Sequence, residues 1–419
     1  MQTTLLQSLR DTSAGREAEA VVRKCVHCGF CLATCPTYQL LGDELDSPRG
    51  RIYLIKQVLE GKTPTAKTQI HLDRCLTCRA CETTCPSGVE YHRLLDTGRA
   101  LVDAQVRRPL LERLRRFLLR ELLPRRRLFT PLVRLGRLFR WLLPVTLRRQ
   151  LLDSSPPRKR GPGSSSGLDS RLRGNDRKVL LLQGCAQPGL RPGINAAAIR
   201  VLARAGISAI EVPAAGCCGA LRFHMGAQDD GRDDMRRLID AWWPRIEAGA
   251  EAIVTTASGC GAHLKDYGRL LRDDAVYAAK AARVSELAKD LSEVVEAESA
   301  TLFREAARSP REFVPVAFQS PCTLQHGQQI RGPVELLLKA AGYELTPVAD
   351  AHLCCGSAGT YSILEPRLAA QLRVNKLAAL GAGRPAVIAT ANIGCLTHLA
   401  AGTDTPVRHW IELLADRLA

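Results

Sequence analysis

Hydrophobic and polar positions follow a regular alternation in the second half of this 419-residue chain. From residue 178 onward, short apolar runs of strand character alternate with stretches in which apolar residues recur at helical spacing. Strands are predicted at residues 178–182, 207–212, 252–256, 313–318, 343–348 and 386–390, and helices at 194–205 and 334–341. Strands that alternate with helices in this way predict parallel α/β sheets.

An internal duplication within residues 178–419 is visible in the cysteines alone. The first copy contains Cys185, Cys217, Cys218, Cys260 and His263, and the second contains Cys322, Cys354, Cys355, Cys395 and His398. Equivalent cysteines lie 137, 137 and 135 residues apart, and a glycine follows each vicinal pair. Each cysteine follows a predicted strand, and sites in parallel α/β sheets form at the carboxyl ends of strands. We therefore expect two four-cysteine sites, one in each copy.

The vicinal cysteines favour metal or redox chemistry over a structural disulfide. A disulfide between neighbouring residues is strained, whereas two thiolates on a glycine-assisted turn can reach one metal centre. Soft sulfur ligands favour an iron–sulfur cluster or zinc. The alternative is that some of these thiols are only small buried side chains. His263 and His398 are either further ligands or residues that pack beside the cysteines.

The first hundred residues contain two cysteine runs of identical form, fifty residues apart. The runs are Cys25, Cys28, Cys31 and Cys35 before Pro36, and Cys75, Cys78, Cys81 and Cys85 before Pro86. This is the bacterial two-cluster ferredoxin pattern, in which the fourth cysteine of each run ligates the other cluster. One [4Fe–4S] cluster is assigned to Cys25, Cys28, Cys31 and Cys85, and the other to Cys75, Cys78, Cys81 and Cys35. A pair of zinc sites is the alternative, but four-cysteine zinc sites usually use two separated Cys-x2-Cys pairs.

The net charge of +17 is concentrated in two segments. Residues 107–149 carry a net charge of +12, and residues 158–178 carry +5, so the rest of the chain is neutral. Such a distribution does not indicate a protein that binds nucleic acid over its whole surface. Residues 154–177 combine proline, glycine, serine and arginine without apolar periodicity, which predicts a flexible linker or an insertion.

The Arg- and Leu-rich segment has two interpretations. It forms either solvated helices with arginine on the outer face, some pairing with a partner subunit, or an interfacial helix that lies on anionic lipid. The chain starts without the pattern of a signal peptide and has no apolar run long enough to span a bilayer. A cytoplasmic location is expected, either free or peripheral on the inner face of the cytoplasmic membrane. In a reducing compartment, sixteen cysteines favour metal ligation or redox chemistry.

The longer motifs resemble a known family of electron-transfer subunits. They include CVHCGFCLATCPTYQLLGDELDSPRGRIYLIKQVLEG, HLDRCLTCRACETTCPSGVEY, AGCCGA, SPCTLQHGQ, HLCCGSAGTYS and ANIGCLTHLA. They resemble the iron–sulfur subunits of flavin-linked 2-hydroxyacid and glycerol-3-phosphate dehydrogenases, most of all those of glycolate oxidase (glycolate dehydrogenase). The family modules generally end in Cys-x-x-Cys, whereas both copies here end in Cys-x-x-His.

The resemblance implies an oxidoreductase subunit without a substrate site of its own. Partner subunits with bound FAD would convert glycolate to glyoxylate, and this chain would carry the electrons to a quinone or another acceptor. It would hold two [4Fe–4S] clusters, with further iron–sulfur or zinc sites in the Cys-Cys-Gly modules. The alternatives are the equivalent subunit of a D-lactate or glycerol-3-phosphate dehydrogenase, or an assembly scaffold that holds zinc.

The expected architecture is multidomain α+β. A helical two-cluster ferredoxin-like domain should occupy residues 1–100, followed by an Arg/Leu-rich helical connector at 101–153 and the linker at 154–177. The first Cys-Cys-Gly module should cover residues 178–310 and the second residues 311–419, each an α/β unit with a parallel sheet.

Overall fold

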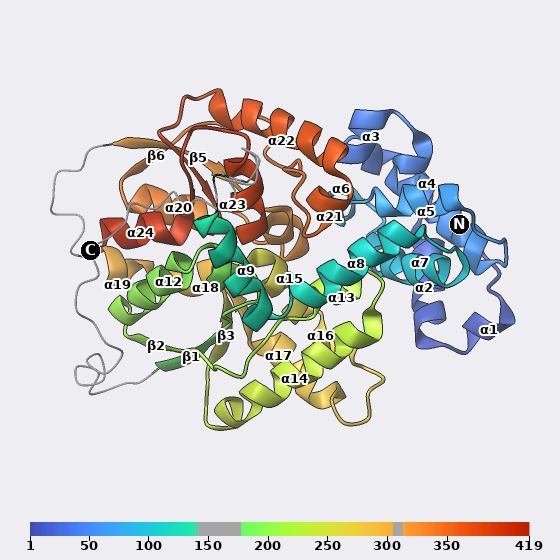
Figure 1. Ribbon diagram of the computed structural model, residues 1–419, viewed down its shortest axis with the longest axis horizontal. Helices are drawn as coiled ribbons and strands as arrows, with labels where there is room; N and C mark the ends of the chain where they lie inside the picture. Colours follow the sequence, from blue (N-terminus) through green and yellow to red (C-terminus); the bar gives the residue numbers. More distant parts are fainter. Residues whose placement is uncertain (140, 142–176, 305–312, 419) are drawn as a thin grey trace.

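The computed structural model describes residues 1–139, 141, 177–304 and 313–418. Most of the predicted linker at 154–177, and the end of the connector, therefore lie outside the described residues. The N-terminal part is helical (Figure 1). Its helices are α1 (Gln7–Arg10), α2 (Ser13–Lys24), α3 (Pro36–Leu41), α4 (Pro48–Leu59), α5 (Ala66–Asp73), α6 (Ala80–Thr84) and α7 (Tyr91–Gln105), with short 3-10 turns η1 (Phe30–Leu32) and η2 (Glu44–Asp46).

Helix α7 is the centre of this N-terminal domain. It packs against α2, α4 and α5, and their apolar faces meet in a core that includes the fully buried Val22, Ile55, Leu59, Leu94 and Leu95. The cysteine runs lie in the loops between these helices, so the helical core determines where the thiols converge. Proline begins helix α3 directly after Cys35 and follows Cys85 at the end of α6, which turns the chain at both fourth cysteines.

Two four-stranded sheets form the second half, and all their strand pairs in the described residues are parallel. The first sheet has the order β2-β1-β3-β4 and the second has the order β6-β5-β7-β8. The strands are β1 (Arg177–Leu181), β2 (Ile207–Ile210), β3 (Ala252–Thr255), β4 (Ala288–Asp290), β5 (Val314–Gln319), β6 (Tyr343–Leu345), β7 (Val387–Thr390) and β8 (Val407–His409). The equivalent topology of the two sheets confirms the duplication and the parallel α/β fold.

Helices cover both sheets (Figure 1). Those of the first module are α11 (Gln187–Leu190), α12 (Gly193–Arg204), α13 (Ala220–His224), α14 (Gln228–Glu247), α15 (Ser258–Lys265), α16 (Tyr267–Leu270), α17 (Ala278–Leu287), α18 (Leu291–Ala297) and α19 (Ser299–Phe303). Those of the second are the π-helical turn η5 (Thr323–Gly327), α20 (Pro333–Ala340), α21 (Tyr361–Leu364), α22 (Pro366–Gly381), α23 (Ile393–Ala400) and α24 (Trp410–Arg417). One apolar core contains strand residues of both sheets, so the two modules pack as a single body.

The connector forms two helices, α8 (Leu110–Leu122) and α9 (Arg126–Leu138), that cross the front of the molecule in Figure 1. Arginines hold them to the body: Arg108 and Arg116 contact Asp73 Oδ2 at 2.5 and 3.0 Å, and Arg137 donates to the Leu190 carbonyl at 2.7 Å. Leucine and phenylalanine side chains lie on the outer surface beside other arginines. The sequence predicts arginine on the outer face of these helices, and the structure shows that apolar side chains are exposed on that face as well.

Candidate metal centres

The eight N-terminal cysteines line two adjoining cavities, and Cys81 borders both of them. One cavity is lined by Cys25, Cys28, Cys31 and Cys85 and is called here the first cavity. The second cavity is lined by Cys35, Cys75, Cys78 and Cys81. Pro48, Cys81 and Tyr91 line both, so the cavities share a wall. Each fourth cysteine therefore lies with the run of the other half, which is the crossed arrangement expected of a two-cluster ferredoxin fold.

Left-handed backbone turns make the two cysteine loops alike. His27 and Thr77 have φ values of 57° and 53°, and Gly29 and Arg79 have φ values of 88° and 63°. The two residues of each pair hold equivalent places in the two runs, fifty residues apart. Positive φ is costly for residues other than glycine and persists where the surrounding structure imposes it. These turns curl each loop so that its three thiols face one cavity.

The side chains around both cavities fit iron–sulfur clusters. Each cavity is lined by at least four thiols, and no carboxylate of the described residues belongs to either lining. Thiolate sets of this kind select iron–sulfur clusters or zinc. Burial raises the pKa of the Cys31 thiol to about 11 and raises the pKa values of Cys78 and Cys81 well above the ordinary range. These thiols are therefore protonated without a metal, and metal binding must displace their protons.

A fully buried arginine lies beside the second cavity. Arg51 Nη1 is 4.0 Å from Cys35 Sγ, and Nη1 and Nη2 each donate to Thr37 Oγ1 at 3.1 Å. Its Nε donates to the His71 carbonyl at 2.7 Å, and its Nη2 pairs with Asp46 Oδ1 at 3.3 Å. The guanidinium thus places a positive charge, with its hydrogen bonds satisfied, next to a cysteine of this cavity.

In each module the four cysteines form one continuous thiol set. In the first thiol set, Cys217 lies beside Cys185 and Cys218, and Cys260 lies beside Cys218. In the second, Cys354 lies beside Cys322 and Cys355, and Cys395 lies beside Cys355. The neighbouring Cys185 and Cys218 hold the pKa of the Cys217 thiol well below its usual range. The structure thus brings these eight cysteines together as two sets of four, one in each module.

The glycine of each Cys-Cys-Gly turn has a conformational and a steric role. Gly219 and Gly356 have φ values of +83° and +90°, and each turn packs on a helix of its own module. A Cβ on Gly219 would lie 2.5 Å from the Gly231 carbonyl oxygen, and one on Gly356 would lie 2.7 Å from that of Ala369. Only glycine allows the backbone to turn here and approach α14 or α22 so closely.

Alanine at Gly219 should destabilise the first module in two ways, through its left-handed backbone conformation and through the steric clash of its Cβ. The loss of unfolding free energy should therefore exceed that expected from the backbone conformation alone. Gly249 provides the matched control, because its φ is +89° but no heavy atom lies within 4 Å of the position that a Cβ would take there. Gly249→Ala should cost about 1–2 kcal/mol of unfolding free energy, and Gly219→Ala at least about 1 kcal/mol more. Chemical denaturation of the two variants gives this comparison. Equal losses would contradict the steric role.

The two candidate histidines are placed differently. His398 Nε2 lies 3.2 Å from the Ala369 carbonyl oxygen, so this ring is engaged with the backbone. His263 is buried against the rings of Phe223, His224 and Tyr267, and none of the described residues lies within hydrogen-bond distance of its Nε2. Burial lowers the pKa of His263 to about 3 and that of His398 to about 4, so both rings are neutral.

The second thiol set adjoins the second cavity. Cys322 and Cys354 belong to one apolar cluster with Leu76, and Cys78 packs against this cluster. Burial raises the pKa of the Cys78 thiol well above its usual range, and the nearby Cys322 adds to this effect. The duplicated modules are therefore not equivalent in position, because the second thiol set lies directly against a cysteine loop of the N-terminal domain.

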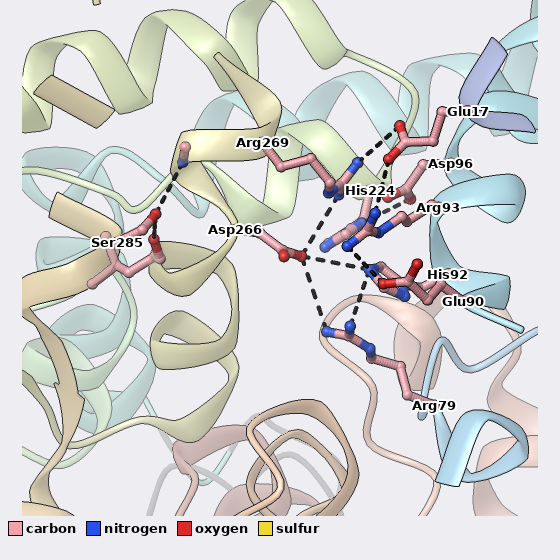
Figure 2. A network of polar contacts seen from close by, with 12 residues as sticks. Glu17, Arg79, Glu90, His92, Arg93, Asp96, His224, Asp266, Arg269 and Ser285 are labelled. Atoms are coloured by element: carbon pink, nitrogen blue, oxygen red, sulfur yellow. Dashed lines mark hydrogen bonds and ion pairs between the residues drawn. The ribbon is translucent and has the colours of Figure 1, made fainter. Parts of the chain in front are cut away.

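A polar network joins the first module to the N-terminal domain. Figure 2 shows Asp266 of the first module pointing toward His92 and Arg79, while Arg269 of the same module reaches Glu17. Asp266 Oδ2 lies 3.7 Å from His92 Nε2, and Glu82 Oε1 lies 2.8 Å from His92 Nδ1. Burial acts to lower the pKa of His92, but the neighbouring Asp266 and Glu82 carboxylates outweigh it, so this pKa is raised. Burial acts to raise the pKa of Asp266, but His92, Arg269 and Arg79 together outweigh it and hold this pKa well below its usual range.

Asparagine at Asp266 should weaken this junction by about 1.5–3 kcal/mol of unfolding free energy. Because its pKa is lowered, the ionised Asp266 stabilises the fold above about pH 4, and this stabilisation is lost as pH falls. Because its pKa is raised, the protonated His92 stabilises the fold below about pH 6.5, and this stabilisation is lost as pH rises. The loss should therefore be largest between these values in denaturation midpoints measured against pH. Asp229→Asn, at a side chain that is 98% exposed in the first turn of α14, is the control and should cost less than about 1 kcal/mol. A pH-independent loss would contradict the ionic role.

Comparisons with known proteins agree with this arrangement of sites. The 4Fe-4S dicluster domain family matches residues 21–89, and the cysteine-rich domain family matches residues 179–265 and 316–400. The protein therefore belongs to the class of iron–sulfur proteins that have one dicluster domain and two cysteine-rich domains.

The similar full-length proteins narrow this class. The chain is 55% identical to the glycolate oxidase iron-sulfur subunit of Escherichia coli K12, covering 100% of this chain and 99% of the relative. It is 32% identical to the probable glycolate oxidase iron-sulfur subunit of Bacillus subtilis 168, covering 95% and 93%. Lactate utilization protein A of Bacillus licheniformis is 26% identical over 53% of this chain and 90% of its own length. The chain belongs to the family of glycolate oxidase iron–sulfur subunits.

Sequence reasoning did not identify Arg51, His92 or Asp266 as residues of the sites. The one signal for Arg51 is that it shares a helical face with Ile55 and Val58, an apolar position where arginine is unusual. Nothing in the sequence marks Asp266 or His92, because their contact joins the N-terminal domain to the first module.

Proposed function

We propose that this chain is the electron-transfer subunit of a glycolate-oxidising complex. It holds one [4Fe–4S] cluster on Cys25, Cys28, Cys31 and Cys85, and the other on Cys75, Cys78, Cys81 and Cys35. Such clusters, when bound, accept and release single electrons. The observation that carries the proposal is the pair of adjoining four-cysteine cavities with crossed fourth ligands. Membership of the glycolate oxidase subunit family supports the substrate.

The exposure of the two cavities suggests the direction of electron flow. Cys28 is an exposed cysteine, and Val26 and Phe30 beside it are 68% and 63% exposed. This apolar rim is suited to contact with a partner subunit that carries FAD and oxidises glycolate to glyoxylate. The second cavity faces inward to the second thiol set. Electrons would therefore enter at the first cavity and leave through the second.

The second thiol set and its counterpart in the first module are proposed as further iron–sulfur or zinc sites. Four neighbouring thiols form a soft donor set in each module. His263 has an unpartnered nitrogen among the described residues and is the better candidate for a further ligand, whereas His398 is bonded to a backbone carbonyl. A quinone or another carrier would be the final acceptor, at the inner face of the cytoplasmic membrane.

A D-lactate or glycerol-3-phosphate dehydrogenase subunit is the second interpretation of the same electron-transfer role. Glycolate is preferred because the match to the glycolate oxidase subunit covers the whole chain, while the match to the lactate utilization protein covers 53% of it. A zinc-bearing scaffold is distinguished by colour, because zinc thiolate sites are colourless and have no redox chemistry.

The test is anaerobic purification of the native complex through a tag on this chain. Glycolate, D-lactate and glycerol-3-phosphate are then added separately, and bleaching of the cluster absorbance is followed. Bleaching by glycolate is the expected result. Bleaching by one of the others alone would transfer the protein to a sister complex. A colourless protein that dithionite does not change would contradict the electron-transfer role itself.

A further inference from the structure

Helices α8 and α9 present an exposed surface that is both apolar and cationic. The large apolar side chains exposed on this surface are Leu110, Leu111, Leu114, Phe117, Leu118, Leu128, Leu132, Leu135, Leu138, Phe139 and Trp141. Leu110 and Leu111 are each 78% exposed. On α8 the apolar positions recur at helical spacing, so they form one face rather than scattered contacts. We call these residues, with the exposed arginines of the same helices, the connector surface.

The connector surface also carries the positive charge of the protein. Seven arginines are exposed between residues 107 and 141: Arg107, Arg113, Arg115, Arg125, Arg126, Arg127 and Arg134. The two acidic residues of this stretch are engaged locally. Glu112 contacts Arg108 and Arg116 at 2.7 and 2.9 Å, and Glu121 contacts Arg125 at 2.5 Å. The outer face therefore combines leucine and phenylalanine with arginine and has no exposed carboxylate among the described residues from 107 to 141.

Such a combination matches one kind of partner. Apolar side chains of this number are suited to an apolar phase, and seven exposed arginines, of which Arg125 pairs with Glu121, are suited to an anionic surface. The boundary between headgroups and acyl chains of an anionic bilayer provides both, and long arginine side chains can reach the phosphates from there. No helix in the described parts of the chain is long and apolar enough to cross a bilayer. Contact would therefore be peripheral.

We infer that the connector surface binds anionic phospholipid and holds the complex on the bilayer. This inference rests on the proposed function only in naming the complex that is held; its argument comes from the exposed residues of α8 and α9. It also gives the arginines on the inner side a role, because Arg108, Arg116 and Arg137 fasten the two helices to the body while their apolar side chains face outward.

The experiment is vesicle flotation of the intact complex, with phosphatidylglycerol vesicles compared with phosphatidylcholine vesicles at low and high salt. Two variants change the connector surface: Leu111→Glu with Phe117→Glu, and Arg113→Gln with Arg127→Gln and Arg134→Gln. Matched controls make the same changes on exposed residues elsewhere: Leu336→Glu with Val374→Glu, and Arg204→Gln with Arg245→Gln and Arg283→Gln. Glycolate bleaching of the clusters is measured on every sample.

The wild type and both controls should float with phosphatidylglycerol vesicles and lose binding at high salt. The arginine variant should lose about a hundredfold in affinity, and the apolar variant at least about tenfold. Failure of the wild type to bind anionic vesicles, while glycolate still bleaches the clusters, would overturn the lipid assignment and leave the proposed function standing. Release of the flavin subunit by the variants would also overturn the lipid assignment, because the connector surface would then be a subunit interface. Vesicle binding without glycolate bleaching would support the lipid surface and contradict the proposed function.

Discussion

Serine at Cys28 should remove one cluster and stop the flow of electrons from the flavin subunit, while glycolate still binds there. Cys28 lines the first cavity at the exposed rim, where the partner is proposed to dock. A serine oxygen is a harder ligand than a thiolate and does not suit an iron–sulfur cluster. Iron content should fall by about half, because the cavity of Cys75 and Cys78 keeps its four thiols. Iron analysis and electron paramagnetic resonance of the reduced chain measure this outcome.

The crossed ligands provide a sharper test of the same arrangement. Cys85→Ser should remove the same resonance signal as Cys28→Ser, although Cys85 belongs to the other cysteine run. Cys35→Ser should instead match Cys78→Ser, because both residues line the second cavity. If Cys85→Ser removed the signal that Cys78→Ser removes, each run would hold its own cluster and the crossed assignment would be wrong. Loss of glycolate binding in Cys28→Ser would contradict the separation of substrate site and electron path.

Methionine at Arg51 should lower the reduction potential of the cluster in the second cavity. Reduction adds negative charge to a cluster, and the buried Arg51 guanidinium beside Cys35 favours that charge. The loss of a charge-assisted interaction of about 1.5–3 kcal/mol corresponds to a shift of roughly 60–130 mV for one electron. The fold should also lose about 3 kcal/mol, because Asp46 is fully buried and would keep only Arg74 and His71 as partners. A redox titration followed by electron paramagnetic resonance measures the potential.

Arg49 and a lysine variant control this experiment. Arg49 lines the first cavity, but its side chain is 30% exposed and it pairs with Glu44 at 2.6 Å. Arg49→Met should therefore shift the potential of the cluster in the first cavity. This shift should be smaller than that of Arg51→Met, since water screens the charge of Arg49. Arg51→Lys keeps the charge without the planar fork and should recover part of the potential. Equal shifts in Arg51→Met and Arg51→Lys would mean that geometry rather than charge sets the potential.

Much of the candidate site could be predicted from the sequence because ligand identity and spacing are local properties. Cys-x2-Cys-x2-Cys-x3-Cys-Pro determines the type of cluster, and a repeat at 137 residues determines that the modules are copies. The strands before the cysteines were also predictable, since apolar runs mark them. Strands β4 and β8 were missed because their sequences, AKD and VRH, are not apolar runs, and their pairing partners rather than their composition make them strands.

Sequence alone thus determined the chemistry of this protein: two ferredoxin-type cysteine runs, two Cys-Cys-Gly copies and a cationic, leucine-rich connector. Tertiary structure decided which of the two Cys-Cys-Gly modules lies against the second cavity. The contact of Cys78 with the cluster that contains Cys322 and Cys354 joins residues more than 240 positions apart. Tertiary structure also decided that Arg51 is buried beside Cys35 and that the leucines of α8 and α9 face outward. Helical periodicity identifies two faces of a helix, but only packing decides which of them is covered.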